Sequence, residues 1–149
     1  MADPQTKPET TLRLRRTFAA PREKVFRAWT TPEAMKRWWI PFEGYAVPAV
    51  EVDLRAGGRY RVAMKNPAGE VFHLSGVYRE VAAPERLVYT WRWELPSMDV
   101  GETLVTVDFT DLGDATEVRL THALFPTAES CEYHSRGWKG TLDQLEKIF

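Results

Sequence analysis

The C-terminal segment, residues 129–149, has apolar side chains at intervals of three and four, which is the spacing of one face of an α-helix. Charged residues occupy many positions between them, and Thr127 is the expected N-cap. The apolar stripe consists of Cys131, His134, Trp138, Leu142, Leu145 and Phe149. Gly137 and Gly140 fall inside this predicted helix, where each glycine costs about 1 kcal/mol relative to alanine. We therefore expect a close packing contact, or open space beside Trp138, at these glycines.

Upstream of this helix, apolar and polar residues mostly alternate, as they do in half-buried β-strands. Residues 11–18 form the first such segment. Two short helices are expected next, at about residues 21–30 and 31–39, because each segment has a proline near its start and apolar residues beyond it. The later alternating segments lie at about residues 50–54, 60–65, 70–81, 86–94, 102–110 and 116–125.

Short turns join the later strands, and strands joined in this way pair antiparallel. The sheet and the long helix each have one apolar face, and packing them together buries both. The sequence therefore predicts an α+β fold with two short helices after the first strand. In it, a curved antiparallel sheet of about six to seven strands wraps around the C-terminal helix. Residues 1–10 are expected to be a flexible leader, and residues 11–149 a single domain.

The charge composition argues against several classes of partner. The chain has 20 basic and 21 acidic residues and a formal net charge of −1, without the positive excess that favours nucleic acids or anionic membranes. Its single cysteine, Cys131, forms no internal disulfide, which suits a reducing cytoplasm. No segment reads as a signal peptide or a membrane span. We expect a cytoplasmic protein, monomeric or homodimeric, that binds neither nucleic acid nor membrane.

Large apolar and aromatic residues recur on the faces that the predicted sheet and helix turn toward each other. They favour a pocket for an apolar or aromatic molecule, since such pockets are mainly hydrophobic with a few polar groups. The candidate ligand-binding residues are Tyr60, Met64, Tyr89, Trp91, Trp93, Phe109, Trp138 and Leu142, with Trp38 and Trp39 at the expected mouth. The same pattern also fits a solid aromatic core, and alternation alone does not separate the two interpretations.

His122 is the candidate polar group of this pocket, because it alternates inward with Leu120 and Leu124. A neutral imidazole has one donor and one acceptor, so His122 suits a general base or an anchor that orients a ligand. The alternative is a structural histidine with both nitrogens satisfied. Cys131 and His134 lie three positions apart, but zinc needs three or four ligands and no second pair has suitable spacing. We expect no metal, no cofactor and no assigned catalytic residue, since no nucleophile elbow, P-loop or dinucleotide motif occurs.

Six segments of the chain carry a family pattern when they are taken in order. They are FAAPREKVFRAWTTPEAMKRWW (18–39), DLRAGGRYRVAM (53–64), SGVYREVAAPERLVYTWRW (75–93), TLVTVDF (103–109), EVRLTH (117–122) and RGW (136–138). Together they resemble the START-like, helix-grip superfamily, also called SRPBCC. Within it, the chain is similar to the homologues of the heat-shock protein 90 ATPase activator. The resemblance implies a cavity between the long helix and the inner face of the curved sheet.

Members of this superfamily include lipid carriers, hormone binders and polyketide cyclases, so three functional hypotheses remain. The favoured one is binding of a small hydrophobic or amphipathic molecule without catalysis. The second is a polyketide cyclase- or hydrolase-like enzyme in the same cavity, which needs at least two converging titratable groups. The third is a chaperone co-factor or protein-interaction module, with an exposed apolar patch expected at residues 38–42. The eukaryotic namesake binds the chaperone with two domains, whereas this chain is one domain long.

Overall fold

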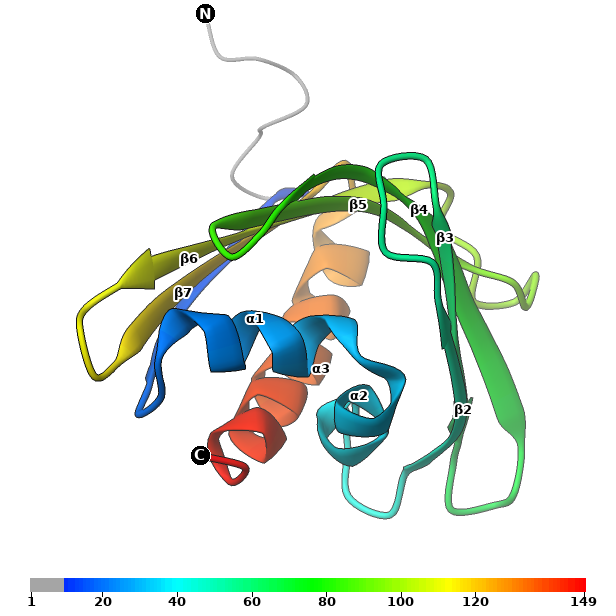
Figure 1. Cartoon of the computed structure of the whole chain (residues 1–149). Helices are drawn as coiled ribbons and strands as arrows, with labels where there is room; N and C mark the ends of the chain where they lie inside the picture. The colour runs from blue at the N-terminus through cyan, green and yellow to red at the C-terminus, as the bar shows by residue number, and fades with distance from the viewer. Residues whose placement is uncertain (1–9) are drawn as a thin grey trace, which may run out of the picture.

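The computed structural model describes residues 10–149, and the secondary structure of this part follows the predicted order (Figure 1). The strands are β1 (Leu12–Phe18), β2 (Ala46–Val52), β3 (Arg59–Lys65), β4 (Val71–Ala82), β5 (Arg86–Trp93), β6 (Thr103–Asp111) and β7 (Thr116–Ala123). The helices are α1 (Arg22–Thr30), α2 (Pro32–Trp38) and α3 (Ala128–Glu146). The leader expected at residues 1–10 lies, apart from Thr10, outside the described residues.

The strands form one antiparallel sheet in the order β1-β7-β6-β5-β4-β3-β2. The first strand therefore pairs with the last, and Leu12 lies opposite His122 in their register. Figure 1 shows the sheet arching over α3, with α1 and α2 on the same concave side. This arrangement confirms the predicted α+β helix-grip fold, in which the concave face of the sheet and the apolar stripe of α3 bury each other.

Two details of the elements follow from local chemistry. The strand β2 begins at Ala46 rather than near residue 50, and its register shifts between Ala46 and Ala49. Pro48 lies inside this shift, which an edge strand tolerates because the missing N–H faces no neighbour. At the start of α3, the Thr127 hydroxyl accepts a hydrogen bond from the Ser130 N–H at 3.1 Å, which confirms the predicted N-cap.

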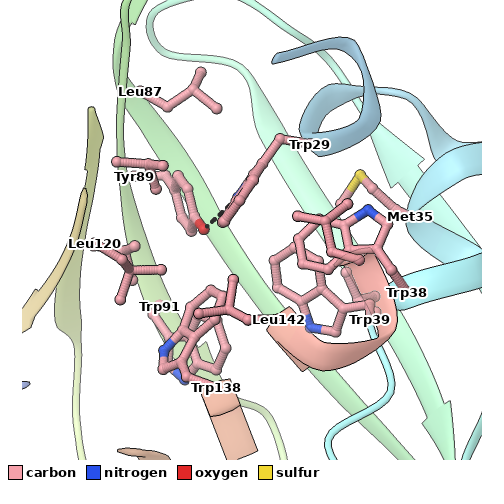
Figure 2. Close-up of a cluster of buried hydrophobic side chains, with 14 of the residues drawn as sticks. Trp29, Met35, Trp38, Trp39, Leu87, Tyr89, Trp91, Leu120, Trp138 and Leu142 are labelled. Carbon is pink, nitrogen blue, oxygen red and sulfur yellow. Dashed lines mark hydrogen bonds between the residues drawn. The ribbon is translucent and has the colours of Figure 1, made fainter. Parts of the chain in front are cut away.

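All six tryptophans of the chain lie in one cluster on the concave side of the sheet, which Figure 2 shows for all of them but Trp93. Neighbouring rings have centroids 4.7 to 6.2 Å apart, within the range of favourable aromatic pairing. The cluster consists of Trp29, Trp38, Trp39, Trp91, Trp93 and Trp138. Because these residues come from α1, α2, β5, α3 and the segment after α2, the cluster joins all three helices to the sheet.

The two glycines inside α3 are required for different structural reasons. A Cβ built on Gly140 would lie 1.9 Å from the backbone oxygen of Pro41, so only glycine permits this approach of the chain after α2. A Cβ on Gly137 would meet nothing nearer than the Pro41 Cβ at 3.5 Å, an ordinary contact. Gly137 also lines a cavity, so one glycine provides close approach and the other provides space.

We predict opposite effects for alanine at these two positions. Gly140→Ala lowers the free energy of unfolding by about 1–3 kcal/mol, because overpacking against Pro41 outweighs the gain of about 1 kcal/mol in helix propensity. Gly137→Ala is the matched control and leaves the protein equally or more stable. Urea unfolding followed by tryptophan fluorescence measures both changes. Equal stability of the two variants would contradict the assignment of the close contact to Gly140.

Candidate functional site

A cavity of about 50 Å³ lies between α3 and the middle of the sheet. The sheet contributes Met64, Phe72, Trp91 and Trp93, and α3 contributes Tyr133, His134, Gly137, Trp138 and Thr141. The chain after α2 and the loop after β5 complete the lining with Trp39, Pro41, Phe42, Tyr45 and Met98. No carboxylate, lysine or arginine is part of this lining. The cavity is therefore an apolar, largely aromatic space, with Phe42, Tyr133 and Met98 as its partly exposed rim.

The structure brings about half of the sequence-predicted residues to this cavity. Those that line it are Trp39, Met64, Trp91, Trp93 and Trp138. Those that lie in the core away from it are Trp38, Tyr60, Tyr89, Phe109, His122 and Leu142. Trp38 is fully buried and donates its indole N–H to the Ala28 carbonyl at 2.8 Å, so it is not at a mouth.

The tyrosines predicted as pocket residues instead fill the core between α1 and the sheet. The rings of Tyr60 and Tyr89 are 5.3 Å apart, and the Tyr89 hydroxyl accepts the Trp29 N–H at 3.2 Å (Figure 2). The hollow beside them, which Met35 and Tyr78 also line, has no room for a water molecule. Burial raises the pKa of Tyr89 far above its usual range, so its hydroxyl stays protonated.

Several cavity residues were not expected from the sequence. They are Pro41, Phe42, Tyr45, Phe72, Met98, Tyr133, His134, Gly137 and Thr141. Two of them had a usable signal, since His134 belongs to the apolar stripe of α3 and Gly137 interrupts a helix that would be more stable without it. Phe42, Tyr45 and Met98 lie outside the helices and strands, where no periodic pattern reports which way a side chain points.

His122 is fully buried and both of its ring nitrogens are engaged within the protein. Its Nδ1 accepts the Trp138 indole N–H at 3.0 Å, so the ring proton is on Nε2. That proton is donated to the Thr103 hydroxyl at 2.7 Å, and Thr103 donates to the Trp91 carbonyl at 3.1 Å. This series of hydrogen bonds connects α3 to β7 and β5. It leaves His122 no free nitrogen for the ligand-anchoring role considered from the sequence.

His134 makes a similar connection with the opposite tautomer, and it does line the cavity. Its Nδ1 is 2.8 Å from the Ser130 carbonyl, which can only accept, so Nδ1 carries the proton. Its Nε2 accepts the Trp93 indole N–H at 2.9 Å. Two tryptophan N–H groups therefore each require a neutral histidine as acceptor.

Trp91 differs from four other buried indoles in its hydrogen bonding. The indole N–H groups of Trp29, Trp38, Trp93 and Trp138 all donate to acceptors in the protein. Trp91 is 6% exposed, and within residues 10–149 its Nε1 has no hydrogen-bond partner. An unsatisfied buried donor costs about 1–3 kcal/mol. Trp91, a residue of the cavity wall, therefore carries a buried hydrogen-bond donor that is unpaired within the described residues.

The site contains few titratable groups. No cluster of three or more His, Cys, Asp or Glu side chains that could hold a metal occurs in the described part of the chain. The titratable groups in the cavity lining are His134, Tyr45 and Tyr133, with no carboxylate to pair with them. None of the helices in residues 10–149 has the length and hydrophobicity needed to cross a membrane.

Comparison with known proteins assigns the family. The sequence profile described as Activator of Hsp90 ATPase homolog 1-like protein matches residues 19–149. The chain belongs to this family. None of the proteins with a curated description matches it.

Solved structures of several bacterial proteins share the fold over nearly their full length. A protein from Chromobacterium violaceum is 31% identical with a TM-score of 0.85, over 93% of this chain and 96% of that chain. The AHSA1 protein from Silicibacter pomeroyi is 29% identical with a TM-score of 0.82, over 93% and 96%. A protein from Nitrosomonas europaea is 28% identical with a TM-score of 0.80, over 95% of both chains.

The two neutral histidines of this Hsp90-activator-like domain predict a pH dependence of stability. Burial lowers the pKa of His122 well below its usual range, and the nearby His134 lowers it further. Burial also lowers the pKa of His134, although its hydrogen bond to Ser130 opposes the shift. The unfolded chain therefore binds protons that the folded protein excludes. The stability contribution is complete above the unfolded pKa of about 6.5 and declines as the pH falls toward the folded values.

We expect the free energy of unfolding to fall between about pH 6.5 and 5, by up to about 2.7 kcal/mol per pH unit while both histidines contribute. His134→Gln keeps an acceptor for Trp93 without a titratable group, so it should remove about half of this slope. Urea unfolding at pH 7, 6 and 5 measures both slopes. A wild-type stability that is flat across this window would contradict the neutral, indole-accepting state of the two rings.

Proposed function

We propose that this protein binds a small, largely apolar molecule in the cavity between α3 and the sheet. The observation that carries the proposal is the free indole N–H of Trp91 in the wall of an otherwise apolar cavity. Ligand sites typically combine a hydrophobic lining with a few polar groups that orient the ligand. Membership of the family supports a ligand-binding or activator-like module in general terms.

The size of the cavity sets how a ligand would enter. Its 50 Å³ exceeds the roughly 10–15 Å³ needed for one water but is well below the roughly 300–1,000 Å³ of a typical ligand pocket. It therefore accommodates one end of a molecule. A groove of about 360 Å³ shares Trp93, Met98, Tyr133 and His134 with the cavity. Movement of the flexible Met98 side chain would join the two spaces.

The other two hypotheses receive less support from the geometry. An enzyme of the cyclase or hydrolase type needs a base beside a second titratable group. The cavity lining has Tyr45 and Tyr133 but no carboxylate, and both ring nitrogens of His134 are already engaged. A protein-interaction patch was expected at residues 38–42, but Trp38 and Trp39 are 0% and 2% exposed. The next three residues of that segment are only partly exposed.

The test is native mass spectrometry of the protein as purified and after incubation with fatty acids, sterols, flavonoids and polyketide-like aromatics. We expect a retained mass that is lost on denaturation. Gly137→Leu should weaken this binding by about tenfold or more, equivalent to about 1.4 kcal/mol, because the leucine side chain fills the cavity. The fold should persist in this variant, since leucine is a better helix former than glycine.

Lys139→Leu is the matched control, because it also introduces a leucine into α3 but away from the cavity. Lys139 is on the exposed side of the helix, so this variant should bind the ligand like the wild type. If no member of the panel adds mass to the wild-type protein, or if Gly137→Leu binds as tightly as Lys139→Leu, cavity binding is wrong.

A further inference from the structure

The acceptors near Trp91 are already in use. His122 and His134 pack against its ring, with centroids 4.9 and 6.1 Å away. Trp138 occupies Nδ1 of His122, and Trp93 occupies Nε2 of His134, while the remaining nitrogen of each ring is a donor. Neither histidine therefore has a lone pair for the Trp91 N–H. Trp91 lines the cavity but its Nε1 is buried, so an acceptor in the cavity reaches this N–H only after a small movement of the lining side chains.

Water is a poor candidate for this acceptor. A buried water normally makes two to four hydrogen bonds with the protein. Beside Trp91 the lining is mainly carbon, and the hydroxyl proton of Thr141 is donated to the Trp138 carbonyl at 2.8 Å. A water bonded to Trp91 would leave most of its own hydrogen bonds unmade. An acceptor atom that belongs to an apolar molecule incurs no such loss.

The cavity also disfavours charge. No lysine or arginine lines it, and its one imidazole is held neutral by accepting from Trp93. A carboxylate or phosphate in this space would give up its hydration without a counter-charge, which is strongly unfavourable. A carbonyl or ether oxygen has a far smaller desolvation cost and still accepts a hydrogen bond.

The rim of the cavity is aromatic. The ring of Phe42 is 5.9 Å from that of Tyr133 and 5.8 Å from that of Tyr45. Tyr133 is 49% exposed, so its ring has area available for a further partner. Flat apolar groups pack favourably against such rings.

From these observations we infer the chemical class of the ligand: an uncharged molecule with a flat apolar body at the aromatic rim and a terminal oxygen acceptor that pairs with the Trp91 N–H. This inference rests on the proposed function and specifies it. The acceptor end enters the cavity, and the body packs against the exposed side of the Tyr133 ring, which is itself in contact with Phe42. The class excludes free fatty acids and phosphorylated lipids as ligands that insert their charged group.

The probes that test this class are acetophenone, ethylbenzene and benzoate, which share a phenyl ring but end in a carbonyl, a hydrocarbon and a carboxylate. Indole N–H resonances of ¹⁵N-labelled protein report binding, and Trp91→Phe identifies the Trp91 signal. Acetophenone should move this signal downfield, whereas ethylbenzene should not. Trp91→Phe should weaken acetophenone about five- to tenfold while ethylbenzene changes less than about twofold, because only the carbonyl loses a hydrogen bond. Benzoate should not bind.

Trp93→Phe is the control, since it removes a cavity indole of the same size whose N–H is already used. It should affect acetophenone and ethylbenzene equally. If both neutral probes bind but Trp91→Phe weakens them equally, the acceptor assignment is overturned and cavity binding stands. Benzoate that binds as tightly as acetophenone overturns the neutral class. Should neither neutral probe shift any cavity-lining indole of the wild-type protein, cavity binding itself fails. The wild-type shifts keep the inference testable even if Trp91→Phe does not fold.

Discussion

A buried indole needs space for a large rigid ring and an acceptor for its polar N–H. These two requirements determine the packing at the centre of the structure. The tryptophan rings pack against one another across α1, α2, α3 and β5. Their N–H groups then need acceptors in a region made almost entirely of carbon. His122 and His134 supply two of them, and each must stay neutral to do so. His122 and His134, which the sequence offers as candidate functional groups, therefore help to hold α3 against the sheet.

The same packing explains where the space is and why it has one polar feature. Rigid rings do not fill the volume opposite Gly137, which has no side chain, so a cavity remains there. Elsewhere the fit is tight, as at Gly140 against Pro41. Trp91 lines this cavity, and its N–H is unsatisfied. An unpaired indole N–H among mainly apolar surroundings has the composition of a binding site.

Much of the fold was predictable because it depends on local pattern. Alternation located the strands, the helical stripe located α3, and the ordered segments identified the family, all of which the structure and comparisons confirm. The cavity was less predictable. Phe42 and Met98 line the cavity from segments outside the helices and strands. Trp38 and Trp39 are adjacent in the sequence, and no pattern there predicts that Trp39, not Trp38, lines the cavity. The alternation correctly predicted that His122 points inward. The partners of its ring nitrogens depend on how α3 packs against the sheet, and a short stretch of sequence does not contain that information.

The most direct test of the central claim is the crystal structure of the protein under xenon pressure. Xenon binds dry apolar cavities without needing hydrogen bonds, so it reports the space independently of any chosen ligand. We expect a xenon atom between α3 and the sheet, beside Trp91, Trp138 and Gly137, and no ordered water there. A cavity that takes up no xenon, or that holds a chain of ordered water molecules, would contradict it.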